Sequence, residues 1–312
     1  MAIWKFEPLA QERIWGGRNL EEKFGRILPE GKKIGETWEL VDRPEAQSVV
    51  EGTGETLGSF WSGTDRKKIF GSRAPEGLRF PILIKLLDAQ DKLSLQVHPP
   101  AGKAKELGGE PKTEMWFFLE TKPGAEIFAG LKNGIGRVEF EKALSVGKVS
   151  ECFHRLGTEA GQAMFLPSGR VHAIGAGNVI LEIQQNSDTT YRVDDWGRKD
   201  ERGKSRELHV KEALESIQWA DHEPAMVQPR GERLLVCDFF KVKRWWVAPG
   251  EIREIISDGK TFRYLFVADG RVKEEGSGEE WSKGAARFVT ADHESVILQG
   301  VEESTVVEVE FP

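Results

Sequence analysis

Short runs in which apolar and polar residues alternate recur along the chain, separated by turn-forming residues. A period of two is typical of β-strands, whose side chains point alternately to opposite faces. The strand candidates are 48–50, 81–87, 93–98, 114–119, 162–166 and 178–185, followed by 234–243, 263–267, 286–289, 295–298 and 305–311. The dipeptide Asp269-Gly270 lies between two such runs and predicts a hairpin turn.

Helical patterns are few and short, at 55–70, 138–144 and 210–217. Because strands and helices do not alternate, a parallel sheet of the βαβ type is not expected. Many antiparallel strands in 312 residues favour an all-β protein with two jelly-roll domains and a few short helices. The composition turns polar near residues 220–224, which predicts a catalytic domain over 1–222 and a C-terminal jelly roll over 223–312.

Composition narrows the class of protein further. With 39% hydrophobic and 30% charged residues the chain is that of a folded globular protein. A net charge of −7 argues against nucleic-acid binding by bulk electrostatics. No apolar run approaches the roughly 20 residues of a membrane span, and the N-terminus lacks signal-peptide features. The only cysteines, Cys152 and Cys237, cannot build a disulfide framework, so a cytoplasmic location is expected, with neither membrane nor nucleic-acid partners.

The first candidate for chemistry is the segment 93–98, in which leucine and valine alternate with polar residues. Strand alternation places Ser94, Gln96 and His98 on one face, and that face would line the lumen of a barrel. Gln96 and His98 would then project side by side, at a spacing suited to sharing a metal ion. A hydrogen-bonded pair in the core is the alternative interpretation.

Two further segments supply more donors of the same kind. Glu114 opens a strongly apolar strand, with Lys112 on the same face, and is either a solvated strand end or a metal ligand. His172 follows a turn built on Pro167 and Gly169, where a hydrogen-bonded core histidine is the alternative. Two histidines, one glutamate and one amide oxygen would form a mixed set that suits Zn²⁺ or another divalent first-row metal.

Residues 179–193 carry the last candidates. Glu182 shares a strand face with Gln184, and Arg192 follows a polar turn. Arg192 would either form a salt bridge on an edge strand or reach into the lumen to bind phosphate or to stabilise an enediolate.

Together these segments resemble the type I mannose-6-phosphate isomerases, in particular the short bacterial form. The resemblance runs through nearly the whole chain and rests on ordered motifs at 14–17, 34–40, 80–89, 93–99, 112–116, 167–175, 184–193 and 206–209. Pro100 and Asp194 depart from the residues usual in that family, and both lie outside the ligand set.

The resemblance implies cupin-type jelly rolls and one zinc ion per chain, bound by Gln96, His98, Glu114 and His172. It also implies catalytic roles for Arg192, Glu182, Lys85 and Lys112, and substrate contacts from Ser94 and Trp15. The implied partner is a small sugar phosphate, and the implied reaction interconverts mannose 6-phosphate and fructose 6-phosphate through a cis-enediol.

The base that moves the proton stays open between Glu182, Lys85, Lys112 and a zinc-bound water. Lys85 stands in the aliphatic run 82–87, and desolvation there would lower its pKa toward a useful range. Two other functions also stay open: a metal-dependent cupin oxygenase, against which Gln96 argues, and a non-catalytic sugar-phosphate sensor, against which the intact charged residues argue.

Overall fold

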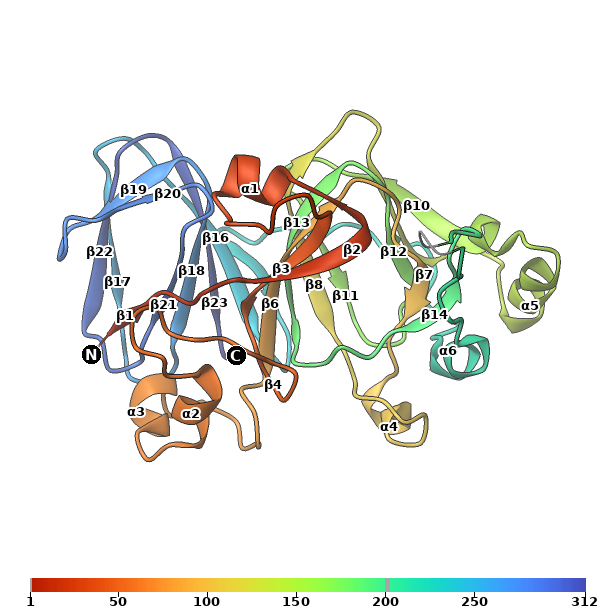
Figure 1. Ribbon diagram of the computed structural model, residues 1–312, viewed down its shortest axis with the longest axis horizontal. Helices are drawn as coiled ribbons and strands as arrows, with labels where there is room; N and C mark the ends of the chain where they lie inside the picture. The colour runs from red at the N-terminus through yellow and green to blue at the C-terminus, as the bar shows by residue number, and fades with distance from the viewer. Residues whose placement is uncertain (1, 200–202) are drawn as a thin grey trace.

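The chain folds into two β-rich lobes, seen side by side in Figure 1. The structure is a computed structural model that describes residues 2–199 and 203–312. Neighbouring strands within the sheets run antiparallel, which confirms the predicted all-β class.

Two sheets build the first lobe. The larger has the order β11-β8-β13-β6-β3-β2 and the smaller has the order β10-β9-β12-β7-β14. The larger sheet comprises β2 (Leu9–Gly17), β3 (Ile34–Leu40), β6 (Ile82–Ala89), β8 (Glu114–Thr121), β11 (Ala163–Leu166) and β13 (Asn178–Gln185). The smaller comprises β7 (Leu95–Val97), β9 (Glu126–Leu131), β10 (Phe153–Gly157), β12 (His172–Ile174) and β14 (Tyr191–Asp194).

The second lobe also contains two sheets, with the orders β1-β21-β18-β23-β16-β15 and β17-β22-β19-β20. The first comprises β1 (Ile3–Trp4), β15 (Arg233–Val236), β16 (Lys241–Val247), β18 (Arg263–Asp269), β21 (Ala286–Val289) and β23 (Ser304–Glu310). The second comprises β17 (Ile252–Ile256), β19 (Arg271–Glu274), β20 (Glu280–Ser282) and β22 (Ser295–Gly300), and a separate short ribbon pairs β4 (Asp42–Arg43) with β5 (Ala46–Gln47).

Short helices lie outside the sheets, with α2 and α3 together at one end of the second lobe and α5 and α6 at the far edge of the first (Figure 1). They are α1 (Asn19–Phe24), α2 (Leu57–Ser62), α3 (Arg66–Phe70), α4 (Ala101–Ala104), α5 (Arg137–Ser145) and α6 (Val210–Ser216), with a 3₁₀ turn at Val149–Cys152. Among the described residues, no helix combines the length and the apolar character that crossing a bilayer requires.

A continuous aromatic core joins the two lobes. The ring of Phe80, just before β6, lies 5.8 Å from Phe311 and 5.4 Å from Phe262 of the second lobe. The N-terminal strand β1 also crosses over, because Ile3 pairs with Val289 of β21. The predicted boundary near residue 222 stays a prediction, since strands and core contacts pass between the segments on either side of it.

Several predicted elements are wrong in detail, and each has a local cause. The single strand at 234–243 is two strands, because Cys237 N–H donates to the Phe240 carbonyl and closes a turn hidden among apolar residues. The helix at 55–70 is two helices, α2 and α3, because Gly63 has an extended backbone conformation that ends the first. Segment 48–50 forms only isolated bridges.

The predicted hairpin at Asp269-Gly270 is also wrong. β18 pairs with β21 and β23, whereas β19 pairs with β20 and β22, so the turn carries the chain from one sheet to the other. Gly270 has a φ of +77°, and a Cβ at this position would lie 2.2 Å from the Glu303 carbonyl oxygen. The turn therefore requires glycine for both its conformation and its close approach.

We expect Gly270→Ala to lower the free energy of unfolding by at least about 2 kcal/mol, because strain and a backbone clash add. Gly259→Ala is the matched control, since Gly259 also has a positive φ of +70°, but a Cβ added there would meet no heavy atom within 4 Å. Urea denaturation followed by fluorescence would measure both variants. Equal losses in the two would show that the contact with Glu303 contributes nothing.

Candidate active site

A cavity of about 350 Å³ lies in the first lobe between its two sheets. It is lined from the larger sheet by residues of β2, β3, β6, β8 and β13, and from the smaller by residues of β7, β12 and β14. Among the lining residues are seven that the sequence predicted: Trp15, Lys85, Ser94, Gln96, Lys112, Glu182 and Arg192. The three remaining predicted residues, His98, Glu114 and His172, form a buried cluster that adjoins the cavity at Gln96 and Lys112.

Strand register brings these distant residues together. In the smaller sheet Gln96 is paired with His172 on one side and with Arg192 on the other. In the larger sheet Glu182 stands opposite Lys85 on one side and opposite Trp116 on the other. Residues directly opposite each other in antiparallel strands project on the same face, so both groups point into the space between the sheets.

The buried cluster has the form of a cation site. The nitrogen and oxygen donors of His98, Glu114 and His172 lie within 4.8 Å of one another. His98 Nε2 is 3.4 Å from Glu114 Oε2, and His172 Nε2 is 3.5 Å from Glu114 Oε1. On the other side of each ring, Nδ1 lies 2.8 Å from the Thr189 carbonyl and 2.9 Å from the Arg170 carbonyl. These two hydrogen bonds orient the rings so that Nε2 faces the cluster.

Several of the nitrogen and oxygen atoms in this cluster that could bind a cation lack a hydrogen-bond partner. His98 Nε2 and both Glu114 carboxylate oxygens are buried and have no hydrogen-bond partner within the described part of the chain, although Glu114 Oε2 lies 3.0 Å from the Lys112 amine as an ion pair. Buried polar atoms without partners are rare because each costs its desolvation free energy. A divalent cation would satisfy all three, and two imidazoles with one carboxylate suit a first-row metal such as zinc. The residues therefore fit a metal ion.

The protonation states also fit. Burial, with the charge of Lys112, lowers the pKa of His98 to about 3, and burial lowers the pKa of His172. Burial opposes ionisation of Glu114, but Lys112 and His98 hold its pKa well below the usual value. Neutral imidazoles and an ionised carboxylate are the forms that bind metal ions.

Gln96 lies beside the cluster but does not point its oxygen at it. Its Nε2 is 3.2 Å from His172 Nε2, and its Oε1 accepts a hydrogen bond of 3.2 Å from the Ser94 hydroxyl. A half-turn of the amide would exchange the two atoms, and the Ser94 hydroxyl could then accept from Nε2. The ligand role of Gln96 stays a prediction.

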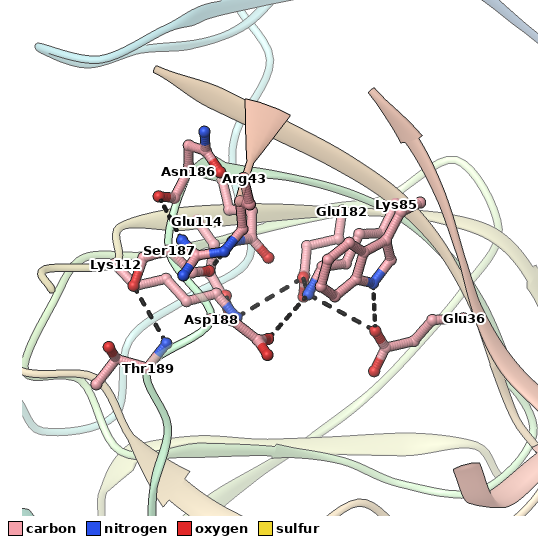
Figure 2. Close-up of polar contacts among 12 residues, drawn as sticks. Glu36, Arg43, Lys85, Lys112, Glu114, Glu182, Asn186, Ser187, Asp188 and Thr189 are labelled. Atoms are coloured by element: carbon pink, nitrogen blue, oxygen red, sulfur yellow. Dashed lines mark hydrogen bonds and ion pairs between the residues drawn. The ribbon is translucent and has the colours of Figure 1, made fainter. Parts of the chain in front are cut away.

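A row of alternating charges leads from the cluster along the cavity (Figure 2). Lys112 Nζ is 3.0 Å from Glu114 and 3.8 Å from Glu182, while Lys85 Nζ is 3.7 Å from Glu182 and from Glu36. Burial opposes the charged form of Lys112, but Glu114 and Glu182 raise its pKa. Burial and the charge of Glu114 raise the pKa of Glu182.

The surroundings of Lys85 differ from those that the sequence suggested. The hypothesis of a useful pKa assumed an apolar strand, yet the amine contacts Glu36 and Glu182 and lies 3.8 Å from Asp188. The aliphatic neighbours of Lys85 in sequence project into other parts of the core, because side chains alternate along β6. Lys85 is therefore buried among carboxylates.

Other residues line the cavity that sequence reasoning did not assign to the site: Arg13, Glu36, Trp116, Asp188, Thr190 and Arg206. Arg13 stands two positions before Trp15 in β2, so strand alternation would have predicted that both side chains face the cavity. Glu36 accepts hydrogen bonds of 2.9 Å from Arg13 Nε and 2.8 Å from Trp38 Nε1. Burial would raise the pKa of Glu36, but the charge of Lys85 and these contacts lower the pKa of Glu36 to about 2. Arg206 follows an irregular segment, where periodicity gives no signal.

Arg192 has a different environment from the lysines. Its Nε is buried and has no hydrogen-bond partner in the described residues. Burial lowers its pKa, and the neighbouring charge of Arg206 acts in the same direction. The outer part of the cavity thus contains a guanidinium whose charge is not neutralised by a contacting carboxylate of the described chain.

Known proteins resemble this chain in sequence and in fold. A family model described as the catalytic domain of phosphomannose isomerase type I matches residues 3–116. The mannose-6-phosphate isomerase ManA of Bacillus subtilis (strain 168) is 38% identical over 252 residues, covering 77% of this chain and 78% of the relative. The crystal structure of the mannose 6-phosphate isomerase from Bacillus subtilis has a TM-score of 0.86 at 29% identity, covering 99% of both chains.

A more distant structure shares the fold. It is a mannose 6-phosphate isomerase bound with zinc and yttrium, with a TM-score of 0.75 at 18% identity, covering 98% of this chain and 99% of that one. At this identity the likeness concerns the fold alone, whereas the identity to the Bacillus relative extends over most of both sequences. This chain belongs to the type I phosphomannose isomerase family.

Proposed function

We propose that this protein is a mannose-6-phosphate isomerase, which interconverts mannose 6-phosphate and fructose 6-phosphate. The observation that carries the proposal is the buried cluster of His98, Glu114 and His172 with unpartnered donors, beside a cavity that holds two lysines and Glu182. Relatives that cover more than two thirds of the chain bear this activity in their names. The substrate is accordingly a small sugar phosphate.

The proposed cofactor is one zinc ion, held by His98, Glu114 and His172 with Gln96 as the fourth ligand. Zinc bound there would act as a Lewis acid that polarises the carbonyl and hydroxyl oxygens of the open-chain sugar. The mixed nitrogen and oxygen donors and the neutral imidazoles support this choice. A cupin oxygenase, the alternative from sequence, is not favoured by any of the relatives described above.

Proton transfer between C2 and C1 requires a base on one face of the sugar. We assign this role to Glu182. Its Oε1 lies between the amines of Lys85 and Lys112, and its Oε2 accepts a hydrogen bond of 2.9 Å from Trp116 Nε1. These contacts fix the carboxylate in one position. Lys85 and Lys112 then orient Glu182 and donate to the oxygens of the enediol as negative charge develops on them.

A coupled assay for the conversion of mannose 6-phosphate to fructose 6-phosphate tests this function. We expect activity in the zinc-loaded protein, its loss on chelation, and its return when zinc is added back. Recovery with iron(II) but not with zinc would contradict the zinc assignment. No turnover in fully zinc-loaded protein would contradict the isomerase and leave the sugar-phosphate sensor as the function to test.

A further inference from the structure

Arginines gather at the outer, more accessible end of the cavity. Arg192 and Arg206 line it, and both also line a second cavity of about 680 Å³ together with Lys204, Ser205 and Glu207. The side chain of Arg206 is 27% exposed, whereas those of Lys85 and Lys112 are 4% and 5% exposed. The cavity therefore has a closed inner end with lysines and an accessible outer end with arginines.

Arg206 is held in place by one buried carboxylate. The Asp195 carboxylate accepts two hydrogen bonds from Arg206, one of 2.8 Å from Nε and one of 2.5 Å from Nη2. The remaining terminal nitrogen, Nη1, donates no hydrogen bond to any described residue. Because Asp195 fixes one edge of the guanidinium, the other edge is oriented and free to bind a ligand.

Arg192 adds a second unpaired donor at the same place. Its buried Nε has no partner, and no carboxylate of the described chain forms an ion pair with its guanidinium. Two neighbouring guanidinium groups repel each other unless an anion lies between them. Arginine forks match the oxygens of a phosphate group, which makes a phosphate monoester the anion that this arrangement fits.

We propose that Arg206, together with Arg192, binds the phosphate group of the substrate at the outer end of the cavity. Asp195 is a positioning residue that holds Arg206 in this orientation. The inference rests on the proposed function and refines it, because it fixes the direction in which the sugar lies. The phosphate is on C6, at the opposite end of the open chain from C1 and C2, so the reacting carbons point inward toward the lysines and the histidine cluster.

The primary test is the affinity of the zinc-loaded protein for fructose 6-phosphate, measured by calorimetry. We expect Arg206→Gln to weaken binding by about 10- to 100-fold, since charge-assisted hydrogen bonds are lost. Arg206→Lys is the second variant, which keeps the positive charge but loses the two-pronged guanidinium. Its affinity should lie between those of wild type and Arg206→Gln. Inorganic phosphate, used as a competitor, should lose affinity in the same order.

Arg253→Gln is the matched control. Arg253 also donates two hydrogen bonds, of 2.7 Å each, to one carboxylate, that of Glu232, but it does not line the cavity, so its replacement should leave the affinity unchanged. Asp195→Asn tests the positioning role. It should raise KM for mannose 6-phosphate with little change in kcat, a split that general loss of folding would not produce.

The outcomes separate this inference from the function on which it rests. Equal affinity of wild type and Arg206→Gln for fructose 6-phosphate would overturn it, and so would a wild type that does not bind this compound. A wild type that binds but does not isomerise, with weakened binding in Arg206→Gln, would contradict the isomerase while supporting the phosphate site.

Discussion

Glu114→Gln is expected to lower kcat by at least about 1,000-fold and to remove bound zinc. The carboxylate is the only anionic donor of the buried cluster, and both of its oxygens lack hydrogen-bond partners in the described chain. The amide that replaces the carboxylate carries no negative charge and therefore binds a divalent cation more weakly. Lewis-acid stabilisation is worth several kcal/mol, of which each 1.4 kcal/mol is a factor of about ten in rate. Steady-state assays and elemental analysis after dialysis would measure both effects.

The matched control for this variant is Glu120→Gln. Glu120 lies on the same strand, β8, but its side chain accepts a hydrogen bond of 2.9 Å from Lys283 Nζ and does not line the cavity. We expect this variant to keep zinc and activity. If Glu114→Gln retained zinc at one ion per chain, the cluster would not be the metal site.

Glu182→Gln is expected to lower kcat by about 1,000-fold or more while zinc stays bound. The amide keeps the size of the side chain and can still accept from Trp116 Nε1, but it cannot take up the proton that moves between C2 and C1. Exchange of the substrate C2 proton with deuterated solvent, followed by NMR, should stop as well. Zinc content should equal that of wild type.

Lys85→Met is the comparison that separates base from positioning group. Lys85 contacts Glu182 and Glu36, so its loss should slow turnover by about 10- to 100-fold without abolishing proton exchange. The opposite pattern, exchange retained in Glu182→Gln and abolished in Lys85→Met, would transfer the base to Lys85. Zinc retained in both variants would exclude loss of the metal as the cause.

For the segment 93–98, the sequence alone predicted which side chains share one face of the strand. Alternation in 93–98 placed Gln96 and Ser94 on one face, and both line the cavity. The strand at 178–185 has the predicted bounds, because the branched apolar residues Val179, Ile180 and Ile183 favour a strand and Gly177 marks the turn before it. The resemblance then grouped His98, Glu114 and His172, whose donors lie within 4.8 Å of one another.

Only the tertiary structure decided which residues from distant strands and irregular segments contact each side chain of the site. The three carboxylates around Lys85 come from β3, β13 and the segment after β13, and only the tertiary structure brings them to one amine. Arg206 follows an irregular stretch and is oriented by Asp195, 11 residues away. Periodicity determines the face on which a side chain lies, whereas its neighbours depend on non-local pairing and packing, which no local pattern encodes.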